Sequence, residues 1–312
     1  MSHSRDWQVG LVGYGEVGRI FAEDLRSQGV AVGAYDIKLG DATGAGALRR
    51  HAGEQGVRLA GTHAELAAGS DLVVSAVTAS QAVAVAVACA ASMRPGAFFL
   101  DINSASPGAK RSAAEAVNAA GGRYVEGAVM TSVPPHRLKV PLLLGGPDAA
   151  ALAPALNLLG FAARVASTTL GVASATKMCR SVMIKGLEAM VIESFTAARH
   201  HGVEDAVIAS LHETFPGIDW EKQAAYFFQR VIEHGQRRSE EMHEVAETVR
   251  EAGLTPWSAG GTADRQAWVA GLADAGVFGP RESNAFARSP DWRTEADRIL
   301  NHGVGTPPGG TP

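Results

Sequence analysis

The amino-acid sequence predicts a doubly wound α/β domain followed by an all-α domain, with one long interdomain helix joining them. Three observations support this fold class. Short apolar runs alternate with helix-like segments through the first half of the 312-residue chain. The strand pattern stops near Thr168, and only helix-like segments follow. The chain is also long enough for each half to bury a core of its own.

The first half contains continuous apolar runs, which predict strands that are buried on both faces. Such strands are typical of a parallel sheet. We expect strands at residues 8–12, 31–35, 71–77, 98–101, 123–129 and 140–144. Between them, segments rich in Ala, Leu and charged residues predict helices at residues 16–28, 80–93, 107–120 and 148–159.

The second half begins with a helical pattern over residues 171–202, where Gly202 is suited to end a helix. Further helices are expected at residues 204–211, 219–234, 237–252, 262–270 and 291–302. We therefore predict a dinucleotide-binding domain at residues 1–167, a helical substrate and dimerisation domain at 168–302, and a flexible tail at 303–312.

Charge and composition exclude several functional classes. The net charge of −4 offers no basic surface to a nucleic acid backbone. The longest apolar stretch, near residues 82–91, is far shorter than the roughly 20 residues that span a bilayer. The polar N-terminus does not resemble a signal peptide. Two isolated cysteines suggest a reducing compartment, so we expect a cytoplasmic protein that binds neither membranes nor nucleic acids.

A glycine-rich motif, Gly13-Tyr14-Gly15-Glu16-Val17-Gly18, lies between the first strand and the first helix. In G-x-G-x-x-G the first glycine permits a tight turn, and the second lets the backbone approach a pyrophosphate. The third lets the helix pack against the strand, while the helix N-terminus supplies partial positive charge. This context predicts a Rossmann-type domain that binds a dinucleotide, with all six residues at the cofactor.

Asp36 ends the second predicted strand, where an acidic side chain can accept hydrogen bonds from an adenosine ribose. Its charge would repel a 2′-phosphate, which favours NAD over NADP. Lys38 could pair with such a phosphate, so NADP stays open as the alternative. Val77 and Thr78 follow the strand at residues 71–77 and are expected to line the cofactor as well.

Four segments resemble the β-hydroxyacid dehydrogenase family, which includes 3-hydroxyisobutyrate and 6-phosphogluconate dehydrogenases. They follow the family's order: residues 9–18, Asp101-Ile102-Asn103-Ser104-Ala105-Ser106-Pro107, residues 124–132, and Leu170-Gly171-Val172-Ala173-Ser174-Ala175-Thr176-Lys177. Residues 180–186 and 237–242 resemble a phosphogluconate-dehydrogenase-like branch with a divergent helical domain. The resemblance implies hydride transfer between a nicotinamide and a β-hydroxy acid, and it implies a homodimer.

The resemblance also assigns site residues. Lys177 matches the family's acid/base lysine, which exchanges a proton with the substrate hydroxyl, although a solvated helix lysine is the alternative reading. Ser104 matches a substrate-loop threonine. Asn103 is expected at both cofactor and substrate, and Ser106 fits a helix N-cap. Thr131 and Ser132 are expected to bind the substrate as well, although they replace two family glycines, which puts recognition of a small carboxylate by this loop in doubt.

Ser181 and Lys185 follow Lys177 at helical spacing, with Arg180 beside them. These residues predict a pocket for a substrate carboxylate, and a solvated cationic stripe is the alternative. Ser181 stands where many relatives have Asn. The histidines lack metal-ligand spacing, so we expect no metal site. Two other functions remain open: imine reduction on the same scaffold, and a redox-silent dinucleotide-binding regulatory module.

Overall fold

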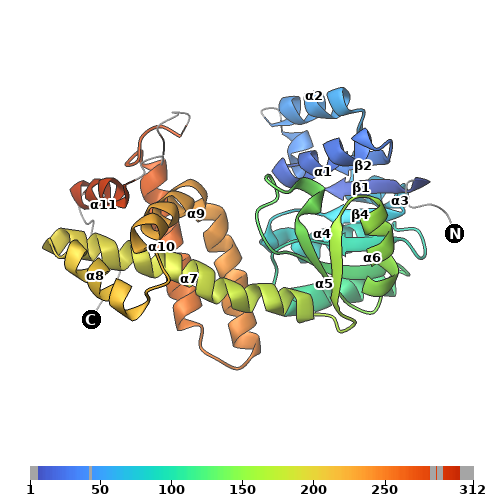
Figure 1. Ribbon diagram of the computed structural model, residues 1–312. Helices are drawn as coiled ribbons and strands as arrows, with labels where there is room; N and C mark the ends of the chain where they lie inside the picture. The colour runs from blue at the N-terminus through green and yellow to red at the C-terminus, as the bar shows by residue number, and fades with distance from the viewer. Residues whose placement is uncertain (1–5, 42–43, 282–285, 287–290, 303–312) are drawn as a thin grey trace, which may run out of the picture. The chain divides into compact units, whose positions relative to one another are not determined.

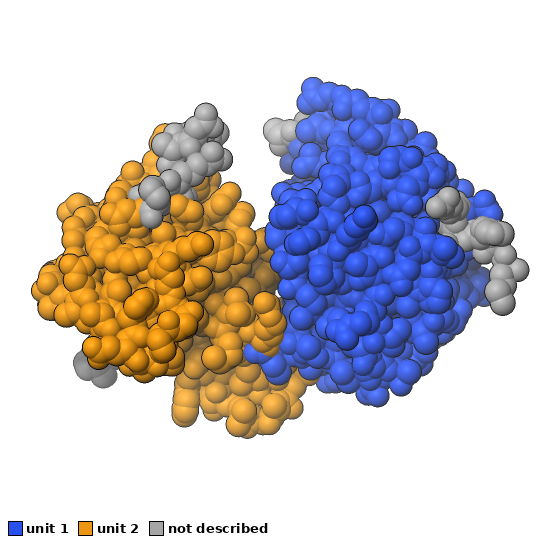
Figure 2. Space-filling model, in the orientation of Figure 1, with its two compact units in different colours: residues 1–179 blue, residues 180–312 orange. Residues whose placement is uncertain are grey.

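The computed structural model describes residues 6–41, 44–281, 286 and 291–302. The chain forms two compact units, residues 1–179 and residues 180–312 (Figure 2). The domain boundary expected after residue 167 is a separate prediction, which this division into units does not test. Within the described residues, no helix has both the length and the apolar composition needed to cross a membrane.

In the described part of unit 1, eight strands form one sheet in the order β3-β2-β1-β4-β5-β6-β7-β8. Figure 1 labels β1, β2 and β4, which are neighbours in this sheet. Neighbouring strands are parallel except for β6 and β7, which are antiparallel. The strands are β1 (Gln8–Val12), β2 (Ala31–Tyr35), β3 (Arg58–Leu59), β4 (Leu72–Ser75), β5 (Phe98–Asp101), β6 (Arg123–Val129), β7 (Pro141–Gly145) and β8 (Ala162–Ser167). The chain reverses direction across the sheet between β1 and β4, where open α/β sheets bind ligands.

Helices cover both faces of the sheet. Alternate strand residues point to opposite faces, so that Phe98 and Leu100 of β5 belong to one core and Phe99 to the other. The first core includes α1 (Glu16–Ser27), α2 (Ala45–Gln55) and α6 (Ala149–Leu158). The second includes α3 (His63–Ala68), α4 (Ala82–Ala90) and α5 (Pro107–Ala119). Short 3₁₀ turns occupy Ile37–Gly40, Ala79–Gln81 and Arg137–Lys139.

The helix α7 (Val172–His201) begins in unit 1 and continues into unit 2. The other helices in the described residues of unit 2 are α8 (Glu204–Thr214), α9 (Trp220–Glu251), α10 (Trp257–Asp274) and α11 (Trp292–Asn301). Their core is apolar and aromatic, with Phe195, Phe228 and Trp292 among its buried side chains. The predicted fold class, a Rossmann-type α/β region followed by a helical region with a long joining helix, is confirmed.

Several details differ from the prediction. The two helices expected at residues 219–234 and 237–252 are one helix, α9. Gly235, in its middle, does not break it: a Cβ there would lie 2.7 Å from the carbonyl oxygen of Gln266, so the glycine lets α10 approach closely. The helix expected at residues 262–270 runs from Trp257 to Asp274.

The sequence pattern also missed short elements of unit 1. Strand β3 has two residues and α3 has six, too few for either to show a period. Strand β8 at the sheet edge alternates between exposed and half-buried residues and has no fully buried ones. The tail at residues 303–312, predicted to be flexible, lies outside the described residues.

Candidate functional site

The candidate site lies at the carboxyl ends of β1, β4 and β5, which are neighbours in the sheet. The glycine-rich segment follows β1 and leads directly into α1, as the sequence predicts. Gly15 is the N-cap of α1 and provides no side-chain hydrogen bond. The first N–H groups of a helix have no partner within the helix, and together with the helix dipole they attract anions.

The three glycines of the motif have different surroundings. Gly13 has φ +88°, and a Cβ there would lie 2.2 Å from the carbonyl oxygen of Ala76. A Cβ on Gly18 would lie 2.1 Å from the carbonyl oxygen of Gly13. A Cβ on Gly15, in contrast, would meet no atom within 4 Å. Packing therefore requires Gly13 and Gly18, whereas Gly15 leaves open space beside the N-terminus of α1. This geometry fits a dinucleotide pyrophosphate.

Asp36 follows β2 and lies beside this segment. Its carboxylate accepts hydrogen bonds from the backbone N–H groups of Tyr14 at 2.8 Å and Lys38 at 2.9 Å. These bonds fix the orientation of the carboxylate, and each oxygen retains lone pairs for ribose hydroxyls. The side chain of Lys38 is exposed, as are Glu16 and, in the loop after β4, Thr78; Val17 is half-buried.

Tyr14 has a side chain that is directed into the protein. Its hydroxyl lies 2.8 Å from Nδ1 of His51, whose Nε2 lies 3.0 Å from the carboxylate of Glu23. The ring is fully buried, and this burial raises the pKa of Tyr14 to about 12. Tyr14 was predicted at the cofactor. Its backbone N–H contacts Asp36, whereas its ring packs in the core.

Asn103 connects the loops that follow β4 and β5. Its Oδ1 accepts a hydrogen bond of 2.7 Å from the N–H of Val77, and its Nδ2 donates to Oγ of Ser75 at 2.9 Å. The residue is 4% exposed, so its amide mainly holds these two loops together. Three residues on, Ser106 accepts a hydrogen bond from the N–H of Ala109, and it is the N-cap of α5 as expected.

Lys177 and Ser104 meet at this edge of the sheet. The Nζ of Lys177, near the start of α7, donates a hydrogen bond of 2.7 Å to Oγ of Ser104 in the loop after β5. Both side chains are half-buried. The two residues are 73 positions apart in the chain, and both lie in unit 1. An amine beside a hydroxyl in partly dry surroundings can exchange a proton with a bound alcohol.

Behind Ser104 lies a buried polar cluster that the sequence analysis did not identify. Lys110 of α5 forms an ion pair of 2.8 Å with Asp101, and both side chains are at most 1% exposed. Tyr124 donates a 2.8 Å hydrogen bond to the same carboxylate, and burial raises its pKa well above 10.0. A sequence signal was present: Lys110 shares a helical face with the apolar residues Ala113, Ala114 and Val117.

Glu126 is a second fully buried carboxylate that the sequence analysis did not assign. It lies in the middle of β6, and its side chain reaches the first residues of α7. The sequence signal was an acidic residue within a run that is otherwise apolar, because such a residue is seldom buried without partners.

The loop after β6 carries the residues expected to replace two family glycines. Thr131 and Ser132 are both exposed. Further along this loop, Arg137 forms ion pairs of 2.7 Å with both Glu23 and Asp24 of α1. The guanidinium therefore attaches the loop to α1, and its charge is neutralised by these two carboxylates.

The remaining predicted residues, Arg180, Ser181 and Lys185, belong to unit 2. Arg180 is exposed, and Ser181 is 7% exposed. The Nζ of Lys185 lies 2.5 Å from the carboxylate of Glu241 on α9. Burial lowers the pKa of Lys185, and the neighbouring Glu241 carboxylate opposes that shift. Lys185 thus has an acidic partner on the same unit. A cation that binds a substrate carboxylate was expected to lack such a partner.

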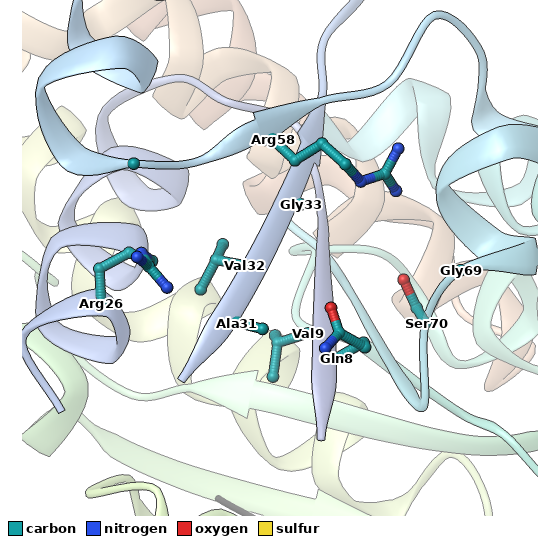
Figure 3. A pocket seen from close by; sticks show the side chains of 10 residues that line it. Gln8, Val9, Arg26, Ala31, Val32, Gly33, Arg58, Gly69 and Ser70 are labelled. Atoms are coloured by element: carbon teal, nitrogen blue, oxygen red, sulfur yellow. The ribbon is translucent and has the colours of Figure 1, made fainter. Parts of the chain in front are cut away.

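A cavity of about 170 Å³ lies at the opposite ends of β1 and β2, beside Arg26 and Arg58 (Figure 3). Arg26 donates hydrogen bonds to the carbonyl oxygens of Val30 and of Gln55, the last residue of α2. Helix C-termini carry partial negative charge, so a cation there stabilises the helix end. Arg58 forms an ion pair of 2.8 Å with Glu65. We interpret both arginines as structural and assign this cavity no ligand.

Comparison with known proteins agrees with the geometry at the carboxyl edge. Residues 8–171 match the NAD binding domain of 6-phosphogluconate dehydrogenase, and the chain belongs to this family of nicotinamide-dinucleotide-binding proteins. Residues 198–269 match a second family, described as a domain of unknown function (DUF1932). The match over residues 8–171 confirms the suspected membership of the family that includes 3-hydroxyisobutyrate and 6-phosphogluconate dehydrogenases.

Solved structures extend the likeness over both units. A conserved hypothetical protein from Sinorhizobium meliloti 1021 is 36% identical, with a TM-score of 0.75 and coverage of 96% of this chain and 97% of that one. The 3-hydroxyisobutyrate dehydrogenase of Mycobacterium tuberculosis, solved with L-serine, is 16% identical, with a TM-score of 0.69 and coverage of 94% and 99%. A reductive aminase from Aspergillus terreus, solved with NADPH and ethyl levulinate, is 20% identical, with a TM-score of 0.52 and coverage of 95% and 99%. The last two similarities concern the fold alone.

Proposed function

We propose that this protein is an oxidoreductase that transfers hydride between NAD and a β-hydroxy acid, or its carbonyl counterpart. The observation that carries the proposal is the 2.7 Å contact between Nζ of Lys177 and Oγ of Ser104. Asn103 precedes Ser104 and is hydrogen-bonded to the loop after β4, next to Gly13. The proton-transfer pair and the dinucleotide loop therefore lie along the same edge of unit 1.

The chemistry follows from what an alcohol needs in order to be oxidised. When bound, the nicotinamide supplies C4 as the hydride acceptor. Loss of hydride from the carbon of the alcohol is costly unless the hydroxyl proton leaves as the carbonyl forms. In this direction Lys177, as a neutral amine, accepts that proton, and in the reverse direction it returns it. Ser104 holds the substrate hydroxyl and orients the amine toward it.

For the cofactor, we propose that backbone N–H groups at the start of α1 bind the pyrophosphate and that Asp36 binds the adenosine ribose. Because the Asp36 carboxylate is fixed by two backbone N–H groups, a 2′-phosphate would meet a negative charge that cannot turn away. We expect Asp36→Ser to weaken binding of NADH and to strengthen binding of NADPH. Titration of both cofactors by fluorescence tests this, and an unchanged ratio of the two dissociation constants would contradict the assignment.

The proposed reaction is tested by a turnover screen. Purified protein is incubated with a panel of β-hydroxy acids and with either NAD or NADP, with the two cofactors at equal concentrations. Formation of the reduced cofactor is then followed over time. We expect at least one β-hydroxy acid to be oxidised, faster with NAD. The panel also includes carbonyl–amine mixtures with the reduced cofactors. Turnover of imines alone would replace the proposal with imine reduction, and cofactor binding without any turnover would favour a regulatory module.

A further inference from the structure

The side chain of Glu126 connects the sheet to the start of α7. Its carboxylate accepts hydrogen bonds from the N–H groups of Gly171 at 2.8 Å and Ala173 at 3.1 Å. It also accepts a hydrogen bond of 2.7 Å from the hydroxyl of Ser174, and a longer one of 3.4 Å from the N–H of the same residue. A single carboxylate from a strand thus satisfies most of the donors that the first turn of α7 leaves without helical partners.

The neighbouring strand makes room for this arrangement. Glu126 is paired in register with Gly145 of β7, and a Cβ on Gly145 would lie 2.2 Å from Oε1 of Glu126. Most helices are capped by a residue adjacent in sequence, which holds the helix end but not its place on the sheet. Here the cap comes from β6, 45 residues before Gly171, so it fixes the start of the helix against the sheet.

Lys177 follows Ser174 by about one helical turn. The direction of its side chain toward Ser104 therefore depends on where the first turn of α7 lies relative to β5 and β6. We propose that Glu126 is a positioning residue for Lys177, which keeps its amine at the hydroxyl of Ser104. The catalytic part of this proposal rests on the proposed function, since it assumes that Lys177 transfers the proton.

Glu126→Gln tests the proposal with little change in side-chain size. The amide retains one acceptor oxygen but turns an NH₂ group toward backbone N–H donors, which weakens the attachment of α7. We expect kcat for the best hydroxy acid to fall by about 100-fold, because small displacements of reacting groups have effects of that size. The dissociation constant for NADH should not change.

A matched control separates positioning from a general loss of stability. Thr62 is the N-cap of α3 and accepts a hydrogen bond of 3.0 Å from the N–H of Glu65. Thr62→Ala removes this helix cap and lowers stability, at a position far from Lys177 in sequence. We expect this variant to retain the kcat of the unaltered protein. If both variants lose kcat equally, or if Glu126→Gln retains it, the proposal is wrong.

A second readout does not depend on turnover. Brief acetic anhydride labelling, analysed by mass spectrometry, gives the reactivity of Lys177 relative to the exposed Lys38. We expect this ratio to rise in Glu126→Gln, because Lys177 would no longer be held at Ser104. If the unaltered protein oxidises no hydroxy acid, the proposed function fails while labelling still tests the positioning. An unchanged labelling ratio would overturn the inference about Glu126 itself.

Discussion

Asp101 and Glu126 are directly paired on the neighbouring parallel strands β5 and β6, and both side chains are fully buried. Each carboxylate has its own partners. Asp101 is neutralised by Lys110 and hydrogen-bonded by Tyr124, while Glu126 faces the backbone donors at the start of α7. The carboxylate of Asp101 also accepts a 2.9 Å hydrogen bond from the N–H of Asn103, which precedes Ser104. The two segments that carry Ser104 and Lys177 are therefore each attached to the sheet through a buried acid.

The ion pair between Lys110 and Asp101 should be important for stability. We expect Lys110→Met to lower the free energy of unfolding by about 3–5 kcal/mol, because removing one partner leaves an uncompensated buried charge. Urea denaturation provides the measurement. As a control, Arg94→Met removes the partly exposed pair of Arg94 with Asp71 and should cost less than about 1 kcal/mol. Equal losses in the two variants would contradict this reading of the buried pair.

Substitutions of the glycines in the dinucleotide loop should distinguish effects on cofactor binding from effects on stability. Gly15 has φ −76°, which alanine adopts without strain, and open space surrounds the position of a Cβ. We expect Gly15→Ala to leave the melting temperature unchanged and to weaken NADH binding at least 10-fold, about 1.4 kcal/mol, because the added methyl occupies the path of the pyrophosphate.

Gly18→Ala is the comparison for that variant. Its Cβ would lie 2.1 Å from the carbonyl oxygen of Gly13, so the substitution should lower the melting temperature as well as the affinity for NADH. Calorimetry and cofactor titration on both variants check the pair of predictions. If Gly15→Ala binds NADH normally, the pyrophosphate does not lie where we place it.

Glu23 predicts a pH dependence of stability. Hydrogen bonds from His51 and Arg137 lower the pKa of this carboxyl below its ordinary value of 4.5. A lowered folded-state pKa stabilises the fold fully above the unfolded pKa, and this contribution is lost as the pH falls through the folded pKa. Melting temperatures of Glu23→Gln and the unaltered protein should therefore differ at pH 7 and converge in acid. If the difference in melting temperature instead grew in acid, the pKa of Glu23 would not be lowered in the folded protein.

Much of the fold follows from sequence because its signals are local. The glycine motif, the apolar strands and the long helical pattern each lie within one short segment, and the structure has a strand, turn or helix in each place. The N-cap role of Ser106 was also predictable, since capping depends on residues a few positions apart.

The buried carboxylates were not predictable in the same way. Whether Asp101 or Glu126 is exposed, paired with Lys110 or bound to the start of α7 depends on strand register and on residues far away in sequence. The antiparallel pairing of β6 and β7 is similarly a property of the assembled sheet. Sequence therefore indicated Lys177 and Ser104, while the structure was needed to find what holds them.

The central claim is that Lys177 exchanges the proton of the substrate hydroxyl, and Lys177→Ala tests it most directly. The control is Thr176→Ala, since Thr176 is the exposed neighbour of Lys177 on α7 and its hydroxyl donates only to the carbonyl oxygen of Val172. Steady-state turnover of the best hydroxy acid is measured together with NADH binding. We predict that Lys177→Ala lowers kcat by about 10²- to 10⁴-fold with NADH binding unchanged, while Thr176→Ala retains activity. A Lys177→Ala variant that keeps most of its turnover would contradict the claim.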